Sequence, residues 1–82
     1  MKFRKKPVVV EAMLFDGDNW LNISDWCKGE VAIQKAKRCI VVHTIDGSMR
    51  ADPGDWIIKG IKGEFYPCKN DVFEQSYEPV EE

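Results

Sequence analysis

Residues 53–69, PGDWIIKGIKGEFYPCK, decide how the strands of this chain are arranged. The Pro-Gly pair at the start suits a tight turn, because proline presets φ at one central position and glycine accepts positive φ at the next. Residues 56–59 are rich in strand-forming side chains and are followed by a glycine-bounded turn at 60–63. A second strand is predicted at 64–67. The stretch therefore predicts a hairpin that is entered through a Pro-Gly turn.

Upstream of this hairpin, apolar residues alternate with a period of two. A strand is predicted to begin at 31–33, the next covers 39–44, and an Asp-Gly pair then predicts a tight hairpin into a return strand at 48–51. The first strand is predicted at 7–15. It is apolar on both faces apart from one glutamate, so we expect it to lie centrally in the sheet or to be partly covered by another chain.

Helical spacing is confined to short segments. Trp20, Ile23 and Cys27 lie on one face of a helix predicted over 19–28, and Gly29 is suited to end it. Near the end of the chain, Asn70 can cap a single helical turn at 71–75, and 76–79 is predicted to close as an edge segment. The sequence thus predicts a mostly β, α+β fold: a small twisted antiparallel sheet or barrel of five to six short strands with one short helix.

The composition is that of a small globular protein. Its 82 residues suffice for a single domain spanning 1–82, and 44% hydrophobic with 32% charged residues argues against global disorder. The net charge of −2 makes nucleic-acid binding an unlikely role in spite of a basic start at Lys2, Arg4, Lys5 and Lys6. No apolar run approaches the roughly 18 residues of a membrane span, so a cytoplasmic protein is expected. The three cysteines are an odd number and are expected to be free thiols.

Patterns typical of catalysis are sparse. The chain has one histidine and lacks the nucleophile elbow, the phosphate-binding glycine loop and the zinc-protease motif. His43 follows Cys39 by four strand residues, about 13 Å, which is too far for a nucleophilic pair. With Cys27 and Cys68 these two residues form a formal zinc set, but no closely spaced cysteine pair is present. We therefore predict no enzyme, no catalytic residue, no metal and no cofactor.

Two carboxylates flank the Pro-Gly turn. Asp52 and Asp55 are expected to accept hydrogen bonds from nearby backbone N–H groups, as turn residues do. A metal site built on the two carboxylates is the alternative interpretation.

The hairpin also presents a candidate ligand surface. Lys59, Lys62 and Lys69, flanked by Trp56 and Tyr66, are predicted to converge on one cationic, aromatic-bordered area. Such an area suits a small anionic ligand of the phosphate or nucleotide type, or an acidic patch on a protein. In the alternative interpretation, the aromatic side chains belong to the core and the lysines keep an edge strand soluble.

The same residues carry a resemblance to a known family. The chain resembles small, uncharacterised accessory proteins of tailed phages and prophages at 4–12, 15–17, 53–60, 63–69, Phe73 and 77–78. About half of the chain is covered, and 20–44 follows no pattern of that family. The resemblance implies a bacterial cytoplasm and a role in infection, and it transfers no catalytic residue.

These observations together predict a non-enzymatic binding protein. In the setting that the resemblance implies, it would counteract host antiviral defence by sequestering a nucleotide-type immune signal or by blocking a host protein. A virion or morphogenesis component is one alternative, and a small metal-dependent hydrolase using Asp52 or Asp55 is another. The first strand, apolar on both faces, also predicts a possible homodimer.

Overall fold

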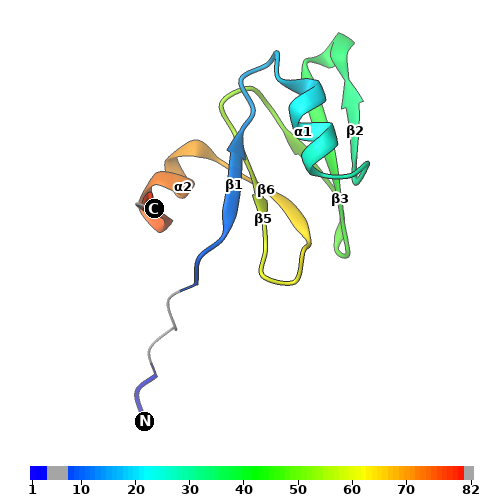
Figure 1. Ribbon diagram of the computed structural model, residues 1–82. Coiled ribbons are helices and arrows are strands. Elements are labelled where there is room, and N and C mark those ends of the chain that lie inside the picture. Colours follow the sequence, from blue (N-terminus) through cyan, green and yellow to red (C-terminus); the bar gives the residue numbers. More distant parts are fainter. Residues whose placement is uncertain (4–7, 81–82) are drawn as a thin grey trace.

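A computed structural model describes residues 1–3 and 8–80 (Figure 1). Six strands and two α-helices are present in this part of the chain. They are β1 (Glu11–Leu14), α1 (Trp20–Trp26), β2 (Val31–Gln34), β3 (Cys39–Thr44), β4 (Gly47–Ala51), β5 (Trp56–Lys59), β6 (Phe65–Cys68) and α2 (Asn70–Ser76). A short 3-10 turn, Lys35–Lys37, separates β2 from β3. The predicted mostly β, α+β fold is confirmed.

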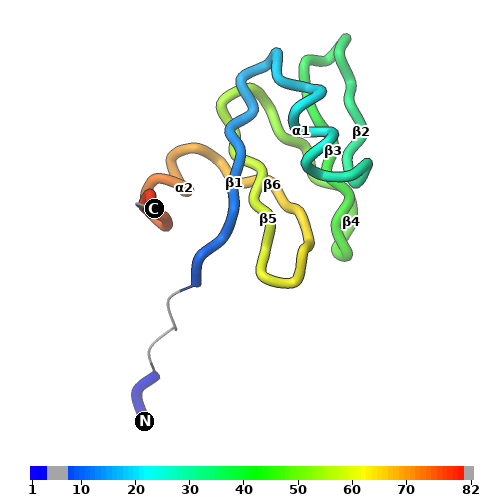
Figure 2. The backbone as a smooth tube through the Cα atoms, viewed as in Figure 1, coloured from blue at the N-terminus to red at the C-terminus, as the bar shows by residue number. Residues whose placement is uncertain are grey.

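The strands form two antiparallel three-stranded sheets, in the orders β1-β5-β6 and β2-β3-β4. Consecutive hairpins build the second sheet, and its β3–β4 turn closes at Gly47, whose φ of 117° is readily accepted only by glycine. In the first sheet β1 pairs with β5, with Glu11 opposite Lys59 and Leu14 opposite Trp56. α1 and the second sheet lie on one side of the first sheet, and α2 lies on the other (Figure 2).

The core fills the space between the two sheets and α1. Ile57 of β5, Ile40 of β3 and Ile23 of α1 are fully buried within one apolar cluster, which also includes Phe15 and Phe65. Burying one such side chain contributes about 1.5–3 kcal/mol, so this cluster holds the two sheets against each other. β6 packs against both β3 and β4, which places the β5–β6 hairpin beside the other sheet.

The predicted architecture contained alternatives, a sheet or a barrel and a central or partly covered first strand, and the structure narrows them. The strands do not close into a barrel, because the Asp52–Asp55 turn carries the chain from one sheet to the other instead of pairing β4 with β5. β1 is an edge strand, since β5 occupies the middle of its sheet, so the central position predicted for β1 is wrong and its coverage by another chain stays a prediction. Its extent is Glu11–Leu14, and the predicted start at Pro7 lies outside the described residues.

The end of the chain also differs from the prediction. α2 continues to Ser76, so the described residues contain a second helix and no closing edge segment at 76–79. Phe73 and Tyr77, four residues apart, stack along one side of this helix and hold it against the sheet, which a pattern of strands does not reveal. Neither helix of the described chain is long and apolar enough to cross a membrane.

Candidate functional site

The predicted cationic surface is divided between the two faces of the β1-β5-β6 sheet. Lys59 pairs with Phe65 and shares the core-side face of β5 with Ile57, whereas Tyr66 pairs with Ile58 and faces α2. Lys59 lies 3.8 Å from the carboxylate of Glu11 on the neighbouring strand. Lys59 and Tyr66 therefore point to opposite sides of the sheet.

The other two lysines lie at opposite ends of the hairpin. Lys62 is exposed in the β5–β6 turn, while Lys69 follows β6 at the far end, about 13 Å away along the strand. The ammonium of Lys69 donates to the Asp55 carboxylate at 3.1 Å and lies 3.9 Å from Asp52. Both contacts are ion pairs within the protein. The structure thus brings Lys62 and Tyr66 together and leaves Lys59 and Lys69 elsewhere.

Trp56 is part of an aromatic stack that attaches α2. Its ring lies parallel to that of Phe73, with centroids 4.2 Å apart and planes 12° apart, and Tyr77 continues the stack at 5.1 Å from Phe73. The Trp56 indole N–H donates to the side-chain carbonyl of Asn70 at 2.9 Å. The Asn70 side chain therefore accepts the hydrogen bond of a half-buried tryptophan, and the predicted role of Asn70 as a helix cap is wrong.

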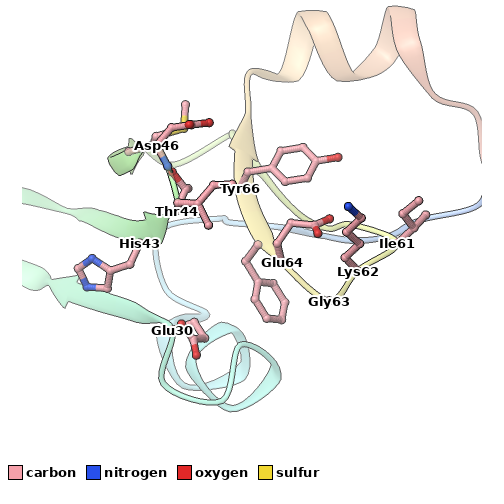
Figure 3. A pocket seen from close by; sticks show the side chains of 12 residues that line it. Glu30, His43, Thr44, Asp46, Ile61, Lys62, Gly63, Glu64 and Tyr66 are labelled. Carbon is pink, nitrogen blue, oxygen red and sulfur yellow. Dashed lines mark hydrogen bonds between the residues drawn. The ribbon is translucent and has the colours of Figure 1, made fainter.

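Lys62 and Tyr66 both border an open hollow of about 980 Å³ between the β3–β4 hairpin and the β5–β6 turn, with the Tyr66 ring directed away from Thr44 and Asp46 (Figure 3). The carboxylates of Glu30, Asp46 and Glu64 also line this hollow. Partial burial and the neighbouring Tyr77 hydroxyl raise the pKa of Tyr66 to about 12, so its phenol is neutral at physiological pH. With three carboxylates and one ammonium, the hollow is acidic, which is unfavourable for an anion.

A second hollow, of about 880 Å³, runs along the outer edge of β1. We call it the edge groove. It extends around both faces of β1, with Met13 and Trp26 on the core side and Ala12, Trp56 and Phe73 on the α2 side. Its remaining lining residues are Val9, Val10, Glu11, Glu74, Tyr77, Glu78, Pro79 and Val80. The groove is therefore mainly apolar and aromatic, and it borders a strand edge that has no partner in the described sheet.

The Asp52 and Asp55 carboxylates have structural contacts. Asp55 is buried and accepts the backbone N–H of Asp52 at 2.9 Å, which confirms its predicted role in the turn. Asp52 accepts instead from the Arg50 guanidinium at 2.7 Å. Among the described residues no group of three histidine, cysteine or carboxylate side chains is placed to hold a metal ion.

The cysteines are free thiols, as predicted. Cys27 and Cys39 are buried, and burial raises the pKa of Cys27 to about 11. His43 is exposed and shares a hydrogen bond with the Ser48 hydroxyl, while Cys39 on the same strand is buried. No nucleophilic pair results from this arrangement.

Most residues of the edge groove are not among those predicted from the sequence to bind a ligand. Of the predicted ligand-binding residues only Trp56 lines it, and the other aromatic walls come from Trp26, Phe73 and Tyr77. One usable signal was the spacing of Phe73 and Tyr77, which places two rings on the same side of a helix. Comparison with models of protein families, with curated proteins and with solved structures found no match to this chain.

Proposed function

We propose that this chain is a non-enzymatic binding protein that blocks a protein partner through the edge groove. The observation that carries the proposal is an apolar, aromatic groove beside an unpaired strand edge. An exposed apolar surface next to free backbone N–H and C=O groups is a typical place for another chain to bind. Given the resemblance to phage accessory proteins, we propose that the partner is a protein of the bacterial host's antiviral defence.

The positions of the lysines favour this form over sequestration of a nucleotide-type signal. Lys59 faces Glu11 and Lys69 faces Asp55 and Asp52, so a phosphate group would have to compete with carboxylates already in place. Lys62 shares its hollow with three carboxylates. Recognition of phosphate requires several converging donors, and Lys59, Lys62 and Lys69 do not converge.

Exposed apolar side chains along the groove support a contact with protein. Val9 is 75% exposed and Val80 is 62% exposed, and both line the groove. Covering such side chains contributes roughly 25 cal/mol per Å² of apolar area removed from water. Binding of a partner over the groove is therefore favoured by removal of this apolar area from water.

Native mass spectrometry of the tagged chain, captured from phage-infected cells, tests the proposal. We expect a stoichiometric complex with a host protein, and we expect Val9→Asp to abolish it. Leu21→Asp is the matched control, because Leu21 has nearly the same exposure, 76%, but lies on α1 away from the groove. The free 9.5 kDa chain, or the chain carrying only a nucleotide, would overturn the proposal.

The same infection separates the proposal from the morphogenesis alternative. Purified phage particles are expected to lack this chain when they are analysed by mass spectrometry. Finding it in the particles in fixed stoichiometry would favour a virion component instead.

A further inference from the structure

The charges around the edge groove indicate what kind of segment it accepts. Its lining includes the carboxylates of Glu11, Glu74 and Glu78 and contains no lysine, arginine or histidine among the described residues. Glu11 is matched in part by Lys59 at 3.8 Å. Glu74 and Glu78 form no ion pair within the described part of the chain and are both exposed. Within the described residues, the groove therefore has a net negative charge on its α2 side.

The aromatic stack next to these carboxylates complements a cation as well. Trp56, Phe73 and Tyr77 line the groove wall as a stack in which Phe73 packs against both other rings, and Glu74 and Glu78 each follow one of these aromatic residues in the chain. A lysine or arginine side chain lays its apolar stem along such an aromatic surface. Its charged end can then reach the carboxylates at the rim.

The backbone of β1 supplies the third element. One side of β1 is hydrogen-bonded to β5, and no described strand pairs with the other side. In a strand added at that edge, successive side chains would point to opposite faces of the sheet. One set would face Met13 and Trp26, and the other would face the aromatic stack and its carboxylates.

From these observations we infer that the edge groove binds an extended, basic segment of the partner protein, which adds as a fourth strand beside β1. Apolar side chains of the segment fill the core-side half of the groove. Its lysine or arginine side chains pack on the Trp56–Phe73–Tyr77 stack and pair with Glu74 and Glu78. The inference rests on the proposed function and specifies the chemistry of the partner.

Short synthetic peptides test this inference on the full chain. Isothermal titration calorimetry is to be run with an eight-residue peptide in which lysine alternates with valine, and with a matched peptide in which glutamate replaces lysine. We expect binding of the first peptide only, and an affinity that falls as salt rises, because exposed charge pairs are screened. N-methylation of alternate peptide bonds removes the N–H groups along one edge and is expected to abolish binding if a strand is added.

Substitution of Glu74 and Glu78 tests whether these two carboxylates pair with the lysines of the peptide. The double variant Glu74→Gln, Glu78→Gln is expected to weaken binding of the lysine–valine peptide by about two- to thirtyfold, the range for two exposed charge pairs. Glu30→Gln is the control, since Glu30 is exposed but lies outside the groove, and it is expected to leave affinity unchanged. Equal binding of both peptides, or no effect of the double variant, would overturn the inference.

Two further outcomes separate this inference from the proposed function. A host partner that depends on Val9 but is insensitive to the double glutamate variant would overturn the basic-segment inference and leave the proposed function standing. Light scattering could instead show that the chain is a dimer, that Val9→Asp converts the dimer to a monomer, and that neither peptide binds. In that case a second copy of the chain occupies this edge, and the inference is overturned.

Discussion

Replacement of Phe73 by alanine is expected to release α2 while the rest of the fold stays intact. The helix has seven residues, none of them buried, and no side chain caps its start. Its attachment depends on the ring of Phe73, which stacks between Trp56 and Tyr77, and on the hydrogen bond from Trp56 to Asn70. A helix this short does not persist in water without such contacts.

The size of the effect can be worked from these contacts. Loss of a half-buried phenylalanine removes about 1–2 kcal/mol of apolar burial, taken as a fraction of the value for a fully buried ring. The two lost aromatic pairs add about 0.5–1.5 kcal/mol each. Alanine returns roughly 0.5 kcal/mol through its better helix propensity. The net loss is therefore about 1.5–4.5 kcal/mol, which is enough to unfold the helix locally.

Amide hydrogen exchange measures this loss directly. In Phe73→Ala the amides of α2 are expected to lose their protection, whereas those of β3 and β5 keep theirs. Val72→Ala is the control on the same helix, since Val72 is 50% exposed and outside the stack. Protection of α2 that survives the Phe73 substitution, or an equal loss of protection in the core strands, would refute the assignment of Phe73 as the attachment point.

Three other predictions concern single groups. Asp55→Ala is expected to lower the free energy of unfolding, measured in urea, by about 1–3 kcal/mol because it removes a buried acceptor. Lys69→Met is expected to lower it by under about 1 kcal/mol because Lys69 is 64% exposed. Equal losses for the two variants would contradict this account. The pKa of Tyr66 is raised to about 12 in the fold, so the folded state retains a proton that the unfolded chain releases near pH 10. The contribution of Tyr66 to the free energy of unfolding is then fully present below pH 10 and is lost as the pH rises to 12. Tyr66→Phe is expected to reduce this loss in urea titrations across that pH range. Finally, Cys68 is expected to react with iodoacetamide at pH 8 before Cys27, whose pKa is about 11, and before Cys39, which is buried. Mass spectrometry after brief labelling measures the order of reaction. Early labelling of Cys27 would show that the core opens.

The strands β3, β4 and β5 could be predicted from the sequence because glycine or proline turns separate them. The Asp46-Gly47 pair and the Pro53-Gly54 pair mark the ends of β4, and β3 and β5 occur at the predicted residues. The predicted 64–67 strand is shifted by one residue, to Phe65–Cys68. Local turn chemistry and a period of two suffice for these elements.

Which distant strands pair with each other could not be predicted in the same way. Nothing in residues 8–15 specifies that β1 pairs with β5, because an apolar strand fits a central and an edge position equally well. The predicted ligand surface failed to assemble for a related reason. Alternation placed Lys59 and Tyr66 on opposite faces, and the acceptors for Lys69, at Asp55 and Asp52, lie in a turn that precedes the hairpin.

The pairing of β1 with β5 also has a consequence for how the chain is made. The ribosome releases β1 early, but roughly forty further residues must be translated before β5 can pair with it, whereas the β2-β3-β4 sheet closes through consecutive turns. We expect the β2-β3-β4 sheet to form first during synthesis, with β1 waiting as an exposed apolar segment. The first strand to leave the ribosome is thus among the last to find its place, and a nascent chain stalled before residue 56 would be the form most in need of a chaperone.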